Sequence, residues 1–357
     1  MKEAFAATVK FNVLEVYNLN SPIFTIENPQ TGFFQEGETN KLFKKLAKKL
    51  YIPTLELFLN QEITLNIIVS GNFLEKAAAL SPKLINLLKK LISQNLIVLA
   101  ADGYYGEDYS SVYNSSWWSS SLVRTIDKIK EVLKIDTKFV YLPQLFRNLE
   151  LERLLEQKKI KHFLLRQKGK KFSKLQSSLS ELRRFNGKTV SWINSENDLN
   201  CHFNFIPDNL FFNINGNYLQ PDLIQASKTF ALAVAFNASE YEIKKDTKKL
   251  RTATKTLRIN EKPVLNLFGH LEKATFRLWE YALRLVLNKY HLEVNEKVSE
   301  LLDDCCRLQN SDFLMYLDKS NYFLGKNVDN FSSPFEAFVF MQSKVKQVEI
   351  IIRNGLV

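Results

Sequence analysis

Short apolar runs alternate with longer amphipathic stretches along most of the chain. The apolar runs have the length and the β-branched or aromatic content of buried strands, which predicts strands at 9–16, 64–69, 96–101, 138–142, 162–165 and 263–268. Apolar residues recur with a helical period between them, which predicts helices at 40–59, 72–94, 121–133 and 147–159. This alternation is typical of a parallel sheet with right-handed crossovers, and its many repeats favour a barrel over a short open sheet.

The pattern becomes wholly helical after residue 268, with helices predicted at 271–288, 295–308 and 334–353. Residues 221–237 fit either a strand or a helix, although Pro221 followed by Asp222 favours a helix start. Residues 240–260 are basic and are expected to be a solvated excursion. We therefore predict an α/β barrel over 1–270 and a C-terminal helical region, packed on the barrel, over 271–357.

The composition is that of a globular protein of about two domains, with 357 residues, 45% hydrophobic and 24% charged. Three cysteines are too few for a disulfide framework, and Cys305 and Cys306 are adjacent, which favours a reducing compartment. The sequence contains neither a recognisable signal peptide nor an apolar run long enough to span a membrane. A cytoplasmic protein is the resulting expectation.

The net charge of +11 comes largely from the basic runs KLFKKLAKKL, RQKGKKFSK and KKDTKKLRTATKTLR. Such runs are able to contact nucleic acid or anionic lipid. They lie on separate segments and are not enriched in arginine, so solvated helix faces are the favoured interpretation. Nucleic acid is therefore not the expected partner, although a basic interaction protein stays open as one alternative.

In a parallel α/β barrel, functional residues follow the C-terminal ends of the strands. The residues that leave the predicted strands are Tyr17-Asn18, Ser70-Gly71-Asn72, Asp102-Gly103-Tyr104-Tyr105, Pro143-Gln144 and Gly269-His270. This polar and aromatic set contains no pair of carboxylates, no nucleophile elbow and no glycine-rich phosphate loop. The four histidines lack the spacing of a metal-ligand pair, and no metal or other cofactor is predicted.

Several of these segments resemble motifs of one enzyme family. IIVSGNFLEKAAALSPKLINLL is similar to a motif in which a strand ends in Ser-Gly and a Glu follows on the helix, and LIVLAADGYYGEDYSS to a strand that runs Ala-Glu-Thr-Tyr-Tyr-His. KKLAKKLYIPTLELFL, FIPDNLFFNI, LQNSDFLMYL and SSPFEAFVFM match further motifs in the same order. The chain thus resembles the α-amylase-like branch of glycoside hydrolase family 57 nearly end to end. The resemblance implies an incomplete (β/α)7 barrel of the TIM type, followed by a helical region.

The departures from the family pattern fall on its active site. The family nucleophile, a Glu in Asn-Thr-Glu-Leu, corresponds to Gln144 in LPQL, and the acid/base, an Asp in Phe-Met-Asp-Tyr-Glu-Thr, corresponds to His270 in FGHLEKA. Glu272 keeps the Glu that follows, whereas Tyr17 and Gly106 stand where the family has histidines. A retaining glycosidase needs one carboxylate to attack and a second carboxyl group to protonate the leaving oxygen. The resemblance therefore implies that both catalytic carboxylates are absent.

Three hypotheses follow from this comparison. The first is a catalytically inactive relative of α-glucan hydrolases that binds an oligosaccharide or a partner protein at the barrel mouth. The contact residues that the resemblance implies are Tyr17, Asn18, Ser70, Glu75, Tyr105, Gly106, Asp208, Glu272 and Asp312. The second is an active glycosidase or glucanotransferase with relocated carboxylates, for which the candidates near residue 102 are Asp102, Glu107 and Asp108, all expected to be solvated. The third is the basic interaction protein. Trp117 and Trp118 are expected to anchor the following helix rather than to stack on sugar.

Overall fold

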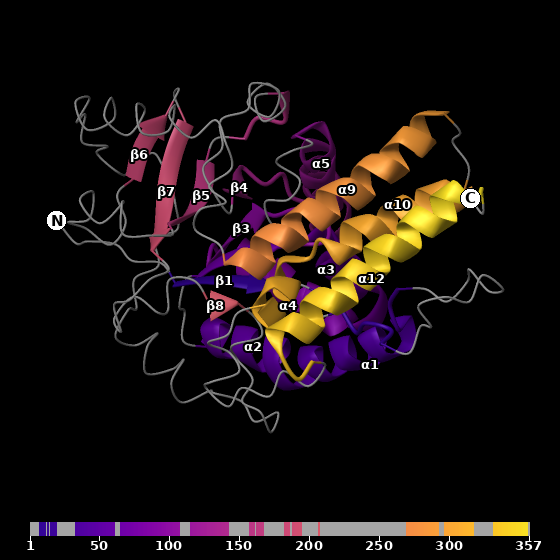
Figure 1. The fold of residues 1–357 in the computed structure, drawn as a ribbon. Coiled ribbons are helices and arrows are strands. Elements are labelled where there is room, and N and C mark those ends of the chain that lie inside the picture. The colour runs from indigo at the N-terminus through magenta and orange to yellow at the C-terminus, as the bar shows by residue number, and fades with distance from the viewer. Residues whose placement is uncertain are drawn as a thin grey trace. The chain divides into compact units, whose positions relative to one another are not determined.

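The chain divides into two compact units in the computed structural model (Figure 1). The structure describes residues 7–11, 13, 15–19, 33–60, 65–107, 115–142, 157–160, 162–167, 182–185, 188–194, 206–207, 269–292, 296–317 and 331–355. Unit 1 comprises Met1–Val13, Phe43–Tyr104 and Ser115–Val264, and unit 2 comprises Leu14–Leu42, Tyr105–Asn114 and Leu265–Val357. The predicted strand at 263–268, the ambiguous segment 221–237, the basic segment 240–260 and most of the helix at 147–159 lie outside the described residues.

An eight-stranded, mostly parallel sheet forms the centre of unit 1 (Figure 1). Its strands are β1 (Ala7–Phe11), β2 (Leu65–Val69), β3 (Ile97–Ala101), β4 (Phe139–Leu142), β5 (His162–Gln167), β6 (Leu182–Phe185), β7 (Lys188–Asn194) and β8 (Ile206–Pro207). They run in the order β6-β7-β5-β4-β3-β2-β1-β8, and only the described β6–β7 pair is antiparallel. The strands predicted at 64–69, 96–101, 138–142 and 162–165 are confirmed to within two residues. An α/β fold with a parallel sheet is therefore confirmed.

The prediction of a first strand over 9–16 is wrong at its C-terminal end, because β1 ends at Phe11. The partner strand β2 ends at Val69, and the next residue, Ser70, already caps a helix and donates its N–H to the Phe11 carbonyl oxygen at 3.4 Å. Among the described residues, the pairing of β1 with β2 therefore ends at Phe11. In unit 2 the chain pairs elsewhere, since the Asn18 N–H donates to the Phe33 carbonyl oxygen at 2.9 Å.

The helix predicted over 40–59 contains a π-helical turn. Helix α1 (Glu36–Leu46) is followed by the π-helix η1 (Ala47–Tyr51) and by α2 (Ile52–Asn60). The Ile52 N–H donates to the Ala47 carbonyl oxygen, five residues back, and Pro53 has no N–H to continue the usual bonding. The π-helical turn lets Tyr51 be fully buried.

The helix predicted over 72–94 is two helices, α3 (Gly71–Leu80) and α4 (Pro82–Ser93). Pro82 is the first residue of α4, where its missing N–H removes no helical hydrogen bond. The apolar period continues across the break, so periodicity alone does not reveal it. Helix α5 (Ser115–Leu133) of unit 1 begins six residues before the predicted start at 121 and includes Trp117 and Trp118, whose side chains lie outside the described part.

Four aromatic rings form a core in unit 1 and join β1 to three helical segments. Phe11, Phe43, Tyr51 and Phe73 are each at most 1% exposed. Their ring centroids lie 4.9 Å apart for Phe11 and Tyr51 and 5.3 Å apart for Tyr51 and Phe73. The rings meet at tilted or edge-on angles, the arrangements that aromatic quadrupoles favour. This core fixes α3 on the sheet, and α3 begins where β2 ends.

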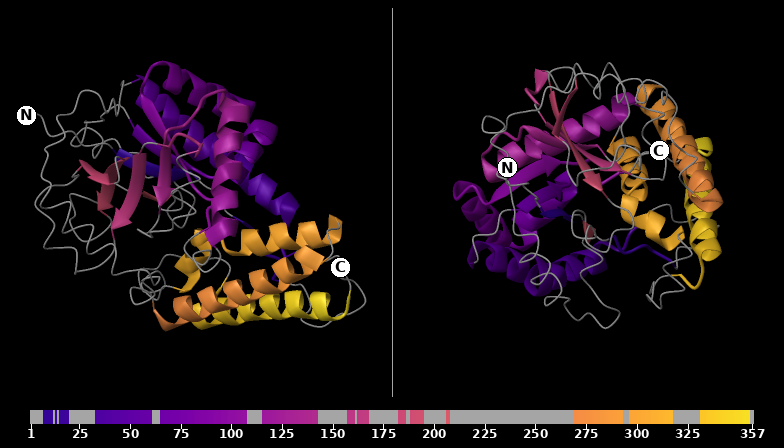
Figure 2. Two further views of the ribbon diagram at one scale, coloured as in Figure 1. Left: turned by 90° about the horizontal axis from the view of Figure 1, so that it is seen from above. Right: turned by 90° about the vertical axis from the view of Figure 1, so that its left-hand side faces the viewer.

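Unit 2 contains α9 (His270–Leu292), α10 (Glu296–Leu308), the 3-10 helix η6 (Ser311–Leu317) and α12 (Pro334–Arg353). The helices predicted at 271–288, 295–308 and 334–353 are thereby confirmed. Helix α9 packs against both α10 and α12 (Figure 2). Between α9 and α12, the buried Trp279 donates its ring N–H to the Met341 sulfur at 3.1 Å. No helix among the described residues is both long and apolar enough to cross a bilayer.

Candidate functional site

The residues that follow β2 in unit 1 form the N-terminus of α3. Ser70 is fully buried, and its hydroxyl oxygen accepts the Phe73 N–H at 3.2 Å, so it is the N-cap of the helix. The neighbouring Gly71 N–H donates to the Thr125 hydroxyl oxygen of α5 at 3.2 Å. A helix N-terminus leaves several N–H groups without helical partners, and these two contacts satisfy part of them. The local fold therefore already uses the hydroxyl of Ser70.

Tyr104 covers this helix start and connects it to Glu75. Its ring lies against Gly71, where any Cβ would overlap the ring atoms. Its hydroxyl donates to the Glu75 carboxylate at 2.6 Å, and the Arg124 guanidinium lies 4.0 Å from the ring centroid. Tyr104 is only 5% exposed, whereas Glu75 is at the surface. The Glu75 carboxylate thus combines a structural hydrogen bond with access to solvent.

The expectation that Asp102 and Glu107 are solvated is wrong. Asp102 directly follows β3 in unit 1, is fully buried, and donates its N–H to the Val69 carbonyl oxygen at 3.0 Å. Glu107, in unit 2, is 2% exposed, and its carboxylate accepts the Tyr105 N–H at 3.0 Å. Glu107 also forms a β-bridge with Asn310, next to η6. Asp102 is thus held through its backbone, and Glu107 through its carboxylate. Asp108 lies outside the described residues.

Tyr17 belongs to the aromatic core of unit 2. It is 4% exposed, forms a β-bridge with Phe34, and meets the rings of Phe313 and Phe340 edge-on at centroid distances of 5.5 and 5.6 Å. This packing buries the ring where the family resemblance places a histidine. The following residue, Asn18, is only partly buried, so its side chain is the more accessible of the two. A sugar contact through Tyr17 stays a prediction.

Tyr105 and Gly106 are also buried in unit 2. Tyr105 is 8% exposed, and its N–H is held by Glu107. Gly106 has a φ of 71°, a left-handed conformation that favours glycine. A histidine at this position would be strained, so the backbone conformation and the loss of the family histidine agree with each other.

His270 and Glu272 lie in the first turn of α9. His270 is exposed at the first position of the helix. The Glu272 carboxylate accepts the Gly269 N–H, as a Glu at this position does in a capping box. The side chain of Glu272 is half-buried and engaged by its own helix. Asp312 lies within η6, and its side chain falls outside the described part, as do Gln144 and Asp208 entirely.

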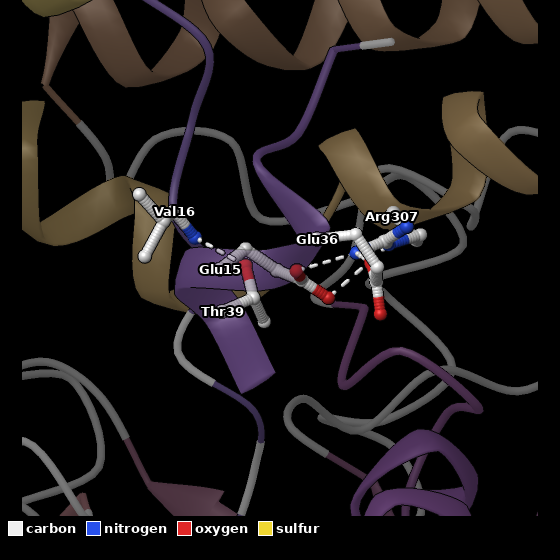
Figure 3. Close-up of polar contacts among 5 residues, drawn as sticks. All are labelled: Glu15, Val16, Glu36, Thr39 and Arg307. Carbon is white, nitrogen blue, oxygen red and sulfur yellow. Dashed lines mark hydrogen bonds and ion pairs between the residues drawn. The ribbon is translucent and has the colours of Figure 1, made fainter. Parts of the chain in front are cut away.

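A polar network in unit 2 holds the segment that leads into Tyr17 (Figure 3). Arg307 of α10 donates to both oxygens of the Glu15 carboxylate, at 3.2 and 2.6 Å, and to Glu36 at 2.9 Å. The side chain of Glu15 is 1% exposed, that of Arg307 16% and that of Glu36 52%. Burial opposes the charge of Arg307, but Glu15 and then Glu36 outweigh it and raise the pKa of the guanidinium. We call Arg307, Glu15 and Glu36 the Arg307 anchor. The sequence gives no local signal for it, because its members lie far apart in the chain.

Lys344 of α12 is a second buried cation in unit 2. It is 2% exposed, and its ammonium lies 5.1 and 5.9 Å from the ring centroids of Phe340 and Phe33. Aromatic faces attract a cation but replace only part of its hydration. Burial accordingly lowers the pKa of Lys344 to about 8. Lys344 therefore makes the folding of unit 2 pH-dependent.

We expect Lys344→Met to raise the free energy of unfolding at pH 7 by about 1–3 kcal/mol. The folded-state pKa of about 8 lies below the usual 10.5, so the folded state binds fewer protons and wild-type stability increases as pH rises from 8 to 10.5. Urea titrations should therefore show a smaller stability difference between the variant and the wild type at pH 10 than at pH 7. Exposed Lys346→Met is the matched control, with a change within about 0.5 kcal/mol. An equal advantage at both pH values would contradict the assignment.

Metal chemistry finds no support in the described part of the chain. No group of three or more His, Cys, Asp or Glu residues that the structure describes is placed to hold a metal ion. Among the sequence-predicted site residues, unit 1 contains Ser70 and Glu75, and unit 2 contains Tyr17, Asn18, Tyr105, Gly106, His270, Glu272 and Asp312. The described members of this set supply hydrogen-bonding groups.

The comparisons with known proteins agree on one family. A model of glycosyl hydrolase family 57 matches residues 14–205. A Methanocaldococcus jannaschii protein named "Putative alpha-amylase" is 28% identical over 154 residues, which cover 40% of this chain and 31% of that protein, so the chain matches about a third of its length.

Two solved structures share the fold at low sequence identity. The 4-alpha-glucanotransferase of Thermococcus litoralis has a TM-score of 0.53 at 13% identity, over 87% of this chain and 54% of that one. The GH57-type branching enzyme of Pyrococcus horikoshii has a TM-score of 0.52 at 10% identity, over 99% of this chain and 92% of that one. These likenesses establish the fold alone.

Proposed function

This chain belongs to glycosyl hydrolase family 57, and we propose that it is a catalytically inactive member that binds an oligosaccharide of the α-glucan class. The binding site in this proposal is the mouth of an incomplete (β/α)7 barrel over 1–270, followed by the helical region 271–357. The strand order supports the barrel, since β1 to β5 lie side by side in chain order and β8 returns to the free edge of β1. A cytoplasmic location and a protein partner at the same mouth belong to this proposal as well.

The observation that carries the proposal is that the first turn of α9 has an imidazole, His270, where the family resemblance places a catalytic carboxyl group. The resemblance places the catalytic acid/base at His270, which is an exposed imidazole, and the neighbouring Glu272 is engaged by the Gly269 N–H. The nucleophile position is Gln144, and an amide is a poor nucleophile that lacks the charge needed beside an oxocarbenium ion. A chain with neither carboxylate at these positions is expected to bind an oligosaccharide without cleaving its glycosidic bonds.

The remaining polar groups suit sugar hydroxyls. Among the proposed contacts, Glu75 is exposed and Asn18 and Glu272 are partly exposed, so solvent and sugar hydroxyls can reach these side chains. The other described members of the proposed set are buried within their own units, Ser70 in unit 1 and Tyr17, Tyr105 and Gly106 in unit 2. Asp208 and Asp312 complete the proposed set. The described lysines of the basic runs support solvated faces, as Lys41 pairs with Glu38 on the surface of α1.

The test is a calorimetric titration of the protein with maltoheptaose, followed by chromatography of the sugar. We expect a saturable heat and no shorter products. Gln144→Ala should weaken binding about three- to tenfold through the loss of one hydrogen-bonding group. Glu131→Gln, an exposed change on α5, is the control and should bind as the wild type does. Heat that continues after each injection, together with shorter products, would overturn the inactive assignment.

A second candidate is an active enzyme with relocated carboxylates, for which Asp102 and Glu107 are the candidates among the described residues. If maltoheptaose is cleaved, Asp102→Asn and Glu107→Gln should each lower kcat by about a hundredfold or more. Cleavage that survives both substitutions would exclude these residues as catalysts.

A further inference from the structure

The Arg307 anchor fixes the chain immediately before the proposed contacts Tyr17 and Asn18. Glu15 precedes Tyr17 by two residues, and its carboxylate is held by a two-pronged contact from Arg307 (Figure 3). Such a fork restricts both position and orientation, because two parallel N–H donors meet two carboxylate oxygens. The Arg307 guanidinium also lies 4.2 Å from the ring centroid of Phe34, the β-bridge partner of Tyr17. Arg307 therefore contacts both Glu15, two residues before Tyr17, and Phe34, which pairs with Tyr17.

Hydrogen bonds of backbone groups also hold the segment 15–18 in place. The Val16 N–H donates to the buried Thr39 hydroxyl oxygen at 3.0 Å, and the Gln35 N–H donates to the Val16 carbonyl oxygen at 2.8 Å. The Asn18 N–H donates to the Phe33 carbonyl oxygen at 2.9 Å. We call the segment closed when these hydrogen bonds are formed. Hydrogen exchange of the Val16, Gln35 and Asn18 amides then reports on the closed form.

Asp304 is a third carboxyl group near the Arg307 anchor. It is partly buried one helical turn before Arg307 on α10. Within the described residues, the charged groups that act on it are Arg307, Asp303 and Glu300 of its own helix and Glu15 of the segment 15–18, while Glu36 of α1 acts through its bond to Arg307. Three of these four charged groups are acids. An ionised Asp304 is therefore a partly buried charge near like charges, while Arg307 is already shared by Glu15 and Glu36.

We propose that Arg307 is the positioning residue for the segment 15–18, and that the carboxyl group of Asp304 makes this anchor pH-dependent. The importance of the segment for binding rests on the proposed function, but the anchor itself does not. When Asp304 is protonated, the cluster holds one cation and two carboxylates. When Asp304 ionises, the desolvated third carboxylate favours an open form in which it becomes hydrated.

The direction of the pH effect follows from the burial of Asp304. Burial, more than the neighbouring acids, raises the pKa of Asp304 from its usual 3.8 to about 6 in the closed form. The closed form binds more protons between these values, so opening becomes more favourable as pH rises through that interval and levels off above 6. Between pH 4.5 and 7 the opening constant should rise about twentyfold. The segment is therefore held most firmly under mildly acidic conditions.

The test is amide hydrogen exchange of the full chain from pH 4.5 to 7, corrected for intrinsic exchange rates. Protection at Val16, Asn18 and Gln35 should fall about twentyfold across the range in wild type and stay flat in Asp304→Asn. Glu300→Gln removes an exposed acid from the same helix and should keep the fall. Arg307→Gln should lose protection at every pH. A flat wild-type profile, or an unchanged fall in Asp304→Asn, would overturn the proposal.

The link to binding is measured separately. The Kd for maltoheptaose should be higher at pH 7 than at pH 4.5 in wild type, with a smaller change in Asp304→Asn. A Kd that changes equally in both proteins would overturn the link between the anchor and the ligand. If maltoheptaose does not bind at any pH, the proposed ligand is wrong, while the exchange profiles still decide whether the anchor responds to Asp304.

Discussion

Gly71→Ala is expected to destabilise unit 1 by about 3 kcal/mol or more, or to prevent its folding. A Cβ at this position would overlap atoms of the Tyr104 ring. The ring cannot easily withdraw, because its hydroxyl donates to Glu75, its face contacts Arg124, and the backbone N–H of Tyr104 donates to the Ser121 hydroxyl oxygen. Overpacking is most costly where the neighbouring group is fixed at several points. The loss should appear as a lower midpoint of urea unfolding.

Two further variants separate this clash from the general effect of a new side chain. Gly37→Ala, at an exposed position of α1 with no atom within 4 Å of the new Cβ, should be neutral or slightly stabilising, because alanine favours a helix. In the double variant Gly71→Ala, Tyr104→Ala the clash is absent, so its destabilisation should be smaller than the sum of the single effects. An additive double variant, or a nearly neutral Gly71→Ala, would show that the close approach is not the cause.

Arg307→Ala is expected to destabilise unit 2 by about 3–5 kcal/mol. The substitution leaves the Glu15 carboxylate, whose side chain is 1% exposed, without its bidentate partner. A buried charge that has lost its partner costs much more than the net worth of the ion pair. Urea unfolding followed by far-UV circular dichroism measures the loss. Arg284→Ala, at an exposed arginine with an i,i+4 contact to Glu280, should change stability by less than about 1 kcal/mol.

The same principle predicts partial rescue. Glu15→Gln removes the charge, so Arg307→Ala combined with Glu15→Gln should be more stable than Arg307→Ala alone, by about 1–3 kcal/mol. The comparison separates the effect of the Glu15 charge in the absence of Arg307 from the effect of the other contacts that arginine makes. A double variant less stable than Arg307→Ala would mean that Glu15 has another partner that compensates its charge.

Periodicity predicted the regular elements well where packing depends on local sequence. The helix at 334–353 has the predicted bounds, with Pro334 at its start and Ser333 as its N-cap. The hairpin β6–β7 was missed, because Arg183 and Arg184 interrupt its first strand. The Asn-Gly pair at 186–187 between the two strands was a usable hairpin signal.

The burial of the site residues depends on contacts that sequence spacing does not contain. Tyr17 follows a predicted strand and looks like a residue of a barrel mouth, yet its neighbours include Phe313 and Phe340, which are distant in sequence. Asp102 and Glu107 look like loop carboxylates because loops are usually solvated. Both are buried in the structure, where the Asp102 backbone is bonded to Val69 and the Glu107 carboxylate to the Tyr105 N–H. The resemblance located these segments, and the tertiary contacts decide their exposure.

The π-helical turn of η1 also has an evolutionary meaning. A π-helical turn contains one residue more than the α-helical turn that it replaces, so it is equivalent to a single-residue insertion. Its hydrogen bond from Ile52 to Ala47 places Tyr51 in the core, and deletion of one residue would rotate the flanking side chains by about 100° relative to each other. Relatives that lack the insertion must fill the position of the Tyr51 ring from another point in their sequence. An alignment that places a one-residue gap within 47–51 would therefore mark the lineage in which this core arose.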